Sequence, residues 1–243
     1  MRFIADLHVH TVASGHAYST VREIARAAAD KGLPMIALTD HGPGMPGGPH
    51  AYHFSNQSAI PDALFGVRIL KGIEANAMDR VGRLDLDDAR LAKLDIVAVG
   101  LHTVCSPYGT VTENTEMMLA VMQNPFVDVI VHPGNPEYLV DEEAVVREAA
   151  RCGVALEVNN SSLTVTRKGS LPHCDHIVAL AAVYGTKLIV GSDSHYCDSV
   201  GEFAAAAELL AKHGIPESQV INTSLENVLS HLNRRGNHRP VTL

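Results

Sequence analysis

The segment Ala5-Asp6-Leu7-His8-Val9-His10-Thr11 places two histidines at the end of a short apolar run. The segment Ser14-Gly15-His16-Ala17-Tyr18-Ser19-Thr20 follows at once and adds a third histidine. Burying an unpaired polar group costs about 1–3 kcal/mol, so imidazoles on a strand that should be buried need partners or a function. These two segments therefore predict a first strand whose end carries a functional site.

Short runs rich in β-branched residues alternate with Ala-rich segments along the chain. The runs predict seven strands, at Phe3–His8, Met35–Thr39, Arg68–Ile73, Ile96–Gly100, Val127–Val131, Val154–Val158 and Leu188–Gly191. Helices are predicted at Thr20–Lys31, Glu113–Gln123, Asp141–Arg151, Cys174–Tyr184, Val200–His213 and Leu225–Asn233. This alternation indicates parallel βαβ units in a closed or nearly closed α/β barrel. No linker divides the chain, so residues 1–243 are predicted to form one domain.

Residue parity in the first strand separates two kinds of side chain. Successive side chains of an extended chain point to opposite faces. Asp6, His8 and His10 are therefore predicted to share one face, with both histidines pointing into the mouth of the barrel. Leu7 and Val9 are predicted to face the helical shell.

Metal-capable side chains recur at or just past the ends of the other apolar runs. In a barrel of βα units, the chemistry collects where the C-terminal ends of the strands meet. Nine side chains are predicted to gather there: His8, His10, His16, His41, Glu74, His102, His132, Asp193 and His195. A catalytic zinc takes about three protein ligands, so nine donors with one bridging carboxylate would saturate about three ions. Imidazole and carboxylate ligands without thiolate suit zinc, manganese or iron, and zinc is the first expectation.

The composition limits which partners the protein can bind. The net charge of −8 disfavours binding of nucleic acid through a basic surface. No apolar stretch approaches the length of a membrane span, and the chain does not open on a secretory signal pattern. The four widely spaced cysteines predict reduced thiols. We therefore expect a cytoplasmic protein that binds neither nucleic acid nor membrane.

Five polar motifs span essentially the whole chain: Asp6-Leu7-His8-Val9-His10-Thr11, Thr39-Asp40-His41-Gly42, Gly72-Ile73-Glu74-Ala75-Asn76, His132-Pro133-Gly134 and Gly191-Ser192-Asp193-Ser194-His195. They resemble the motifs of the PHP (polymerase and histidinol phosphatase) family of metal-dependent phosphoesterases. Ser14–Thr20, Val131–Asn135 and Glu157–Ser161 look especially like the small stand-alone bacterial phosphatases of the YcdX type. The resemblance implies the PHP fold, a distorted (βα)7 TIM-like barrel that holds a trinuclear metal site.

The resemblance also implies how the nine ligands divide among the three ions. One ion would be held by His8, His10, Glu74 and Asp193. Glu74 would bridge to a second ion, which His102 and His132 would complete. The third ion would be held by His16, His41 and His195.

The predicted reaction is hydrolysis of a phosphate monoester of a small metabolite. A hydroxide that bridges two metal ions is the expected nucleophile, because bound cations lower the pKa of water. Asp193 is the candidate for proton transfer, and Glu74 is the second catalytic carboxylate. Asp6 and Asp40 each lie near a ligand histidine and are expected to orient imidazoles.

Candidate substrate contacts follow the sixth predicted strand. Arg167 and Lys168 are the basic candidates for binding substrate phosphate, and a fork-shaped guanidinium suits that task. Asn159 shares its parity with Glu157, so both are expected to face the barrel interior, and Asn159 is a third candidate.

Two other functions compete with phosphate ester hydrolysis. An amidohydrolase-type enzyme that cleaves C–N bonds also uses His-x-His on a first strand, but it usually needs a bridging lysine carbamate. Here the third predicted strand offers Glu74, whereas Lys71 has the opposite parity. A non-catalytic metal-binding or polymerase-accessory module is the second alternative. The intact ligand set and the absence of a basic patch favour the phosphatase.

Overall fold

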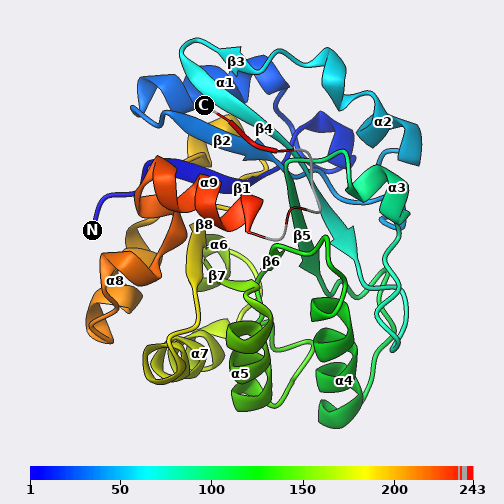
Figure 1. The fold of residues 1–243 in the computed structure, drawn as a ribbon, viewed down its shortest axis with the longest axis vertical. Helices are drawn as coiled ribbons and strands as arrows, with labels where there is room; N and C mark the ends of the chain where they lie inside the picture. Colours follow the sequence, from blue (N-terminus) through cyan, green and yellow to red (C-terminus); the bar gives the residue numbers. More distant parts are fainter. Residues whose placement is uncertain (235, 237–239, 243) are drawn as a thin grey trace.

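The barrel is built from seven parallel strands among the residues that the computed structural model describes, which are 1–234, 236 and 240–242. These strands are β1 (Ala5–Val9), β2 (Met35–Leu38), β4 (Val67–Asn76), β5 (Ile96–Gly100), β6 (Val129–Ile130), β7 (Ala155–Asn159) and β8 (Leu188–Gly191). They pair in this order, and the short β3 (Ala63–Leu64) pairs antiparallel with β4 (Figure 1). The predicted strands and the α/β barrel are confirmed.

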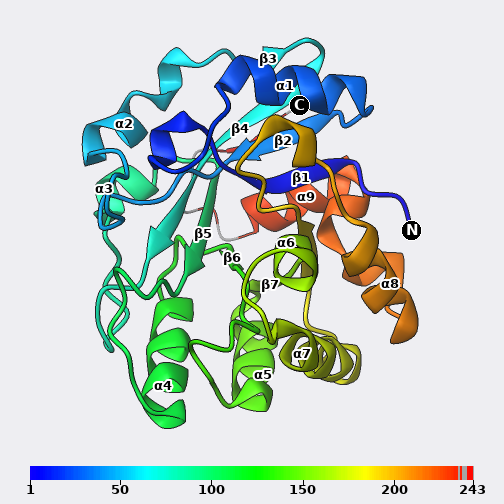
Figure 2. The same ribbon diagram turned by 180° about the vertical axis from the view of Figure 1, so that it is seen from behind.

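Helices surround the strands on the outside, as the views from both sides show (Figures 1 and 2). They are α1 (Val21–Asp30), α2 (Ala51–Ser55), α3 (Asp88–Leu91), α4 (Val111–Met122), α5 (Glu142–Cys152), α6 (Asn160–Thr164), α7 (Ser170–Tyr184), α8 (Ala204–Lys212) and α9 (Leu225–Asn233). All six predicted helices are present. The unpredicted α2, α3 and α6 are too short to show helical periodicity. No helix in the described part of the chain is long and apolar enough to cross a membrane.

Local sequence signals define the ends of the outer helices. Thr20 and Thr110 each form a capping box with the glutamate three residues later, at the start of α1 and α4. Asp141 caps α5 through the amide of Ala144. Gly153 ends α5 in a left-handed conformation, with φ of 68°.

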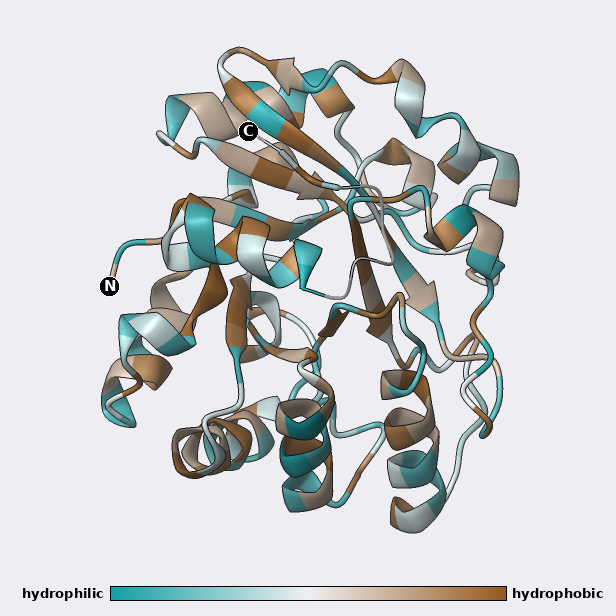
Figure 3. Ribbon diagram, viewed as in Figure 1, coloured by the Kyte–Doolittle hydropathy of each residue, from teal (hydrophilic) through white to brown (hydrophobic). Residues whose placement is uncertain are grey.

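Two apolar layers lie on the two sides of the strands. The larger layer packs the outward strand residues, such as Ile36, Val97 and Val190, against the helices. The smaller layer fills the barrel interior and includes Ala37 and Ile189. Residues of the C-terminal segment close the interior at the N-terminal end of the strands: Ile221, Val228 and Leu232. Apolar colouring dominates the strands in Figure 3, and buried polar side chains follow at the C-terminal ends of the strands.

The parity predicted for β1 is wrong at Leu7 and Asp6. Leu7 packs in the barrel interior, and Val9 packs in the outer layer as predicted. The pairing of β1 with β2 shifts register between Asp6 and Val9. This bulge inserts one extra residue, so Leu7 and the later His8 can both face inward.

Asp6 was predicted to orient an imidazole, but its carboxylate binds backbone amides instead. Its carboxylate accepts hydrogen bonds from the backbone amides of His8 (3.4 Å), Ser192 (3.2 Å) and Gly201 (2.8 Å). Burial raises its pKa to about 6, although these hydrogen bonds oppose the rise. Asp6 therefore joins β1 to the segments that follow β8.

The barrel closes where β1 meets β8. Near the C-terminal end, the amide of Asp193 donates to the carbonyl of His8 (3.0 Å), and the amide of His10 donates to the carbonyl of Ser194 (2.9 Å). At the other end, the buried side chain of Asn222 lies between the strands. Its Nδ2 donates to the carbonyls of Ala5 and Val190, both at 2.8 Å, and its Oδ1 accepts from the amide of Val190 (3.0 Å).

Replacing Asn222 with Ala is expected to destabilise the barrel. The substitution removes three hydrogen bonds and leaves buried backbone groups without partners. Each such group costs about 1–3 kcal/mol, so the free energy of unfolding should fall by roughly 2–4 kcal/mol in urea denaturation. Asn56→Ala is the control, because Asn56 is exposed and makes no capping bond. Equal stability of the two variants would contradict this role for Asn222.

Candidate metal centre

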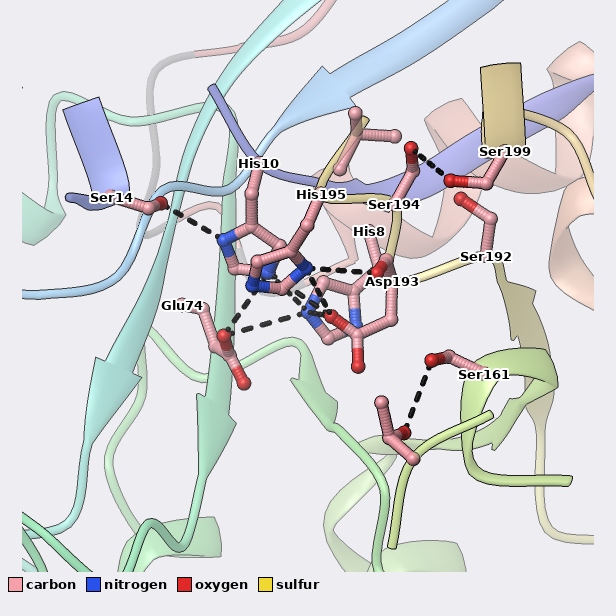
Figure 4. Close-up of polar contacts among 12 residues, drawn as sticks. His8, His10, Ser14, Glu74, Ser161, Ser192, Asp193, Ser194, His195 and Ser199 are labelled. Atoms are coloured by element: carbon pink, nitrogen blue, oxygen red, sulfur yellow. Dashed lines mark hydrogen bonds and ion pairs between the residues drawn. The ribbon is translucent and has the colours of Figure 1, made fainter. Parts of the chain in front are cut away.

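All nine predicted ligands gather at the mouth of the barrel, the end where the C-termini of the strands lie. Figure 4 shows His8, His10, Glu74, Asp193 and His195 directed toward one another from β1, β4 and the segment after β8. The remaining ligands follow β1, β2, β5 and β6: His16, His41, His102 and His132. Seven of the nine are largely buried, whereas His195 is partly exposed and His16 is exposed.

The first ligand group consists of His8, His10, Glu74 and Asp193. The two Nε2 atoms of the histidines lie 3.1 Å apart. Their distances to Glu74 Oε2 are 3.5 and 3.4 Å, and their distances to Asp193 Oδ1 are 3.5 and 3.3 Å. Four ligands placed tetrahedrally at zinc bonding distances are separated by roughly 3.3–3.4 Å. These five distances are close to the spacing expected in a zinc site.

Glu74 belongs to more than one ligand group because its two oxygens face different imidazoles. Oε1 lies 2.8 Å from His132 Nε2 and 3.1 Å from His102 Nε2. Oε2, which faces the first group, also lies 2.8 Å from His41 Nδ1. A carboxylate in this position can bridge two cations.

The predicted third group is brought together less tightly. Ring nitrogens of His41 and His195 lie within 4.8 Å of each other and of a ligand nitrogen of His10. His16 joins them through its ring, whose centroid lies 4.8 Å from that of His41 and 5.1 Å from that of His195.

Unpartnered buried atoms show that these residues fit metal ions. Among the described residues, His41 Nδ1, Glu74 Oε2 and His102 Nε2 are buried and make no well-aligned hydrogen bond, although each lies within 3.1 Å of an atom of another ligand. Buried polar atoms in folded proteins are almost always hydrogen-bonded, so these three call for another partner. A cation that accepts nitrogen and oxygen ligands satisfies all three.

The pKa shifts of Glu74, His10 and His132 suit metal binding, whereas neighbouring carboxylates raise the pKa of His8 well above its usual value. Burial opposes ionisation of Glu74, but the nearby imidazoles, His41 foremost, hold its pKa well below the usual range. Burial lowers the pKa of His10 to about 3 and that of His132 to about 4. At neutral pH the carboxylate is therefore ionised and these two imidazoles are neutral, as metal ligands must be.

Three residues at the mouth hold left-handed backbone conformations that favour glycine. The φ angles are 38° at His132, 45° at Arg167 and 53° at Asp193. Such conformations cost of order 1–3 kcal/mol and cluster at functional sites. Here they turn three functional side chains toward the barrel axis at the point where a strand or helix has ended.

Side chains that orient the ligands form a layer which the sequence analysis recognised only in part. Asp40 accepts from the hydroxyl of Ser14 (2.7 Å), and that hydroxyl lies 3.0 Å from His10 Nδ1. Asp40 thus reaches the ligand imidazole of His10 through Ser14 rather than directly. Asn76 Oδ1 lies 2.8 Å from His102 Nδ1, and Asp85 holds the amide of Asn76 at 2.5 Å.

Glu157 is the most important contributor that the sequence analysis did not assign to the site. Its Oε1 lies 2.7 Å from His8 Nδ1. The available signal was its parity with Asn159, which places a carboxylate inside an apolar strand. Ser14 and Asp85 carried no comparable signal, because their positions depend on loop geometry.

A cavity of about 430 Å³ opens beside the ligands. Arg167, Glu137, Met45 and Val104 line it together with the two ligands His16 and His102. Arg167 Nη1 donates to Asp193 Oδ2 at 2.8 Å, so the guanidinium lies between this cavity and the first ligand group.

The two other predicted substrate contacts have different surroundings. Lys168 is exposed and does not line the cavity. Asn159 is fully buried, and its Nδ2 donates to Glu157 (3.0 Å) and Asp193 (3.2 Å) while its Oδ1 accepts from the amide of Ser162 (2.8 Å). Its polar atoms are already engaged within the protein, which does not fit a substrate contact.

The chain belongs to the PHP domain family, whose model matches residues 6–232. It is 48% identical to a probable phosphatase from Caldanaerobacter subterraneus over 97% of this chain and 93% of that protein. It is 46% identical to a probable phosphatase from Acetivibrio thermocellus over 97% of each chain. The predicted family is therefore confirmed, and the predicted class, a hydrolase of phosphoric esters, agrees with these relatives.

A solved structure shares the fold at much lower sequence identity. The histidinol phosphate phosphatase from Lactococcus lactis, complexed with zinc, L-histidinol and phosphate, superposes with a TM-score of 0.57. The two chains are 17% identical, and the match covers 87% of this chain and 94% of that one.

Replacing Glu74 with Gln is expected to reduce metal content by more than one ion. The substitution removes the negative charge that two ligand groups share, because each oxygen of Glu74 faces different imidazoles. Elemental analysis of the purified protein after metal-replete expression measures the change. Glu148→Gln, on the outer face of α5, is the matched control and should keep the wild-type content. A metal content of E74Q equal to that of the control would contradict the bridging position.

Proposed function

We propose that this protein is a metal-dependent phosphatase that uses three ions to hydrolyse phosphate monoesters of small molecules. The observation that carries the proposal is the shared carboxylate of Glu74 at the centre of nine converging donors, next to an open cavity. Zinc is the expected metal because the donors are imidazoles and carboxylates at tetrahedral spacing, and manganese or iron would suit the same donor types. Bound ions would supply positive charge for the phosphate oxygens and a water of lowered pKa.

Arg167 is the candidate for contact with the substrate phosphate. It is the only arginine or lysine among the described residues that line the cavity. Asp193 orients it through Nη1, and only this nitrogen makes hydrogen bonds within the described chain. The other edge of the planar guanidinium can therefore donate two parallel bonds to a phosphate.

Asp193 and Glu74 contribute to the reaction as ionised carboxylates. Burial opposes ionisation of Asp193, but His8 and Arg167 hold its pKa well below the usual range. In this state Asp193 would hold a cation and could accept a hydrogen bond from the attacking water. Glu74 keeps its charge in the same way and holds the ligand groups close together.

The geometry favours phosphate chemistry over the C–N hydrolase alternative. A bridging lysine carbamate would require Lys71 at the ligand groups. The Nζ of Lys71 instead pairs with Asp62 and faces the carbonyl of Pro61 (3.5 Å). Glu74 occupies the bridging position. The intact donor set beside an open cavity also favours an enzyme over a non-catalytic or polymerase-accessory module.

Hydrolysis of p-nitrophenyl phosphate by the zinc- or manganese-loaded protein is the direct test. Activity is expected in the wild type, and His10→Ala and Asp193→Ala should each lower kcat by at least roughly 10²–10³-fold, because each removes a ligand of the first group. Activity on amide or lactone substrates with none on phosphate esters would overturn the reaction class. Elemental analysis that finds one ion or none in the wild type would overturn the three-ion site.

Arg167→Ala is expected to weaken substrate binding, with Lys168→Ala as the matched control. A charged hydrogen bond contributes roughly 1.5–3 kcal/mol, so kcat/KM should fall about 10- to 100-fold. Inhibition by inorganic phosphate should weaken in parallel, because the same contact holds the product. Lys168→Ala should stay within about twofold of the wild type, since Lys168 is exposed and outside the cavity. Equal effects of the two substitutions would contradict the assignment.

A further inference from the structure

Glu157 is a buried carboxylate inside the barrel that is not one of the nine ligands. It lies on β7 with 3% of its surface exposed, and both of its oxygens are engaged. Oε1 lies 2.7 Å from His8 Nδ1. Oε2 accepts from the backbone amide of His132 (2.8 Å) and from Asn159 Nδ2 (3.0 Å).

We propose that Glu157 is a positioning residue that couples two ligand groups. One oxygen sets the imidazole of His8, which belongs to the group with Asp193. The other holds the backbone of His132 in place. The imidazole of His132 belongs to the ligand group at Glu74 Oε1. The proposal rests on the metal dependence proposed above and adds a residue that determines how firmly the ions bind.

The contact with His8 fixes which ring nitrogen is free to bind a cation. A carboxylate at Nδ1 holds a proton on that nitrogen, so Nε2 is the nitrogen that binds a cation once its own proton is lost. Nε2 is the atom that lies 3.1 Å from His10 Nε2 and 3.5 Å from Asp193 Oδ1. A carboxylate partner also makes the imidazole a stronger electron donor to the metal.

The contact with His132 supports a strained backbone. His132 has a φ of 38°, a conformation that a residue other than glycine adopts at a cost. The hydrogen bond from its amide to Glu157 Oε2 holds the residue in this conformation. The imidazole then places Nε2 2.8 Å from Glu74 Oε1. Without this bond, the backbone could relax and turn the imidazole away from Glu74.

The neighbouring strand is shaped to leave space for Glu157. Gly191 on β8 pairs with Asn159, two residues beyond Glu157. A Cβ atom at position 191 would overlap Glu157 Oε1 and approach the Cβ of His8 to 2.9 Å. Glycine at this position therefore leaves room for both the carboxylate and the imidazole that it orients.

A matched control exists on the outer helices. Glu142 contacts the Nδ1 atoms of two imidazoles, with Oε1 2.5 Å from His173 and Oε2 close to His176. These three residues lie on α5 and α7, outside the ligand groups. Replacing Glu142 therefore shows what the loss of a carboxylate–imidazole contact does away from the ligand groups, for comparison with the replacement of Glu157.

The test compares the metal affinity of the Glu157→Gln and Glu142→Gln variants with that of the wild type. It does not depend on enzyme activity. Each protein is loaded with zinc and titrated with a chromophoric chelator, and the ions retained are counted by elemental analysis. Loss of a partner that orients a metal-binding histidine typically costs 10- to 100-fold in affinity. E157Q should show this loss for ions of both coupled groups, whereas E142Q should match the wild type. The visible spectrum of the cobalt-loaded E157Q should also change, because the geometry at His8 and His132 is altered.

The possible outcomes separate a failure of the positioning role of Glu157 from a failure of the metal dependence. Wild-type affinity and cobalt spectrum in E157Q would overturn the positioning role, and loss of only one ion would overturn the coupling. If E157Q does not fold, Glu157→Asp keeps the charge but shortens the reach by one methylene. It should then bind ions more weakly than the wild type, and unchanged affinity would overturn the role. A wild type that binds no zinc would instead refute the metal dependence on which the proposal rests.

Discussion

The rest of the site depends on one buried charge, the carboxylate of Glu74. Burying one ion without compensation costs several kcal/mol, so its charge must be matched from every side. The residues whose ring nitrogens lie within 3.5 Å of its two oxygens come from four strands and the segments after them: His8, His10, His41, His102 and His132. The strands must therefore end at heights that let all five imidazoles reach one point, and this requirement fixes the shape of the barrel mouth.

The barrel meets this requirement by separating apolar and polar contacts along its axis. The interior is apolar near the N-terminal ends of the strands and is closed there by residues of the C-terminal segment, including Ile221 and Leu232. The hydrophobic effect thus stabilises the barrel at the N-terminal ends of the strands. The C-terminal ends can therefore carry charged groups that do not themselves stabilise the fold. Asp6 and Asn222 join β1 to β8 and keep the two ends in one closed structure.

Much of the candidate site followed from sequence because its ligands sit at corresponding positions. Each comes at or just past the end of an apolar run, so parallel strands bring them to one edge without knowledge of any contact. The prediction failed at Leu7 and Asp6, where a bulge in β1 reverses the parity. The prediction that Asn159 contacts substrate could not take into account that its polar atoms have partners within the protein, because parity does not reveal such contacts.

The sequence by itself determined the order of the main strands and helices, the family and the nine candidate donors, since these depend on local pattern and on residue type. Tertiary structure decided which atoms face each other. Glu157 reaches His8 across 149 residues of chain, and Asp40 reaches His10 only through Ser14. Such contacts require the closure of the barrel and backbone conformations such as that of His132, neither of which is encoded in any single segment. Hydrogen-bond geometry is precise to tenths of an ångström, and only the packed molecule sets positions that finely.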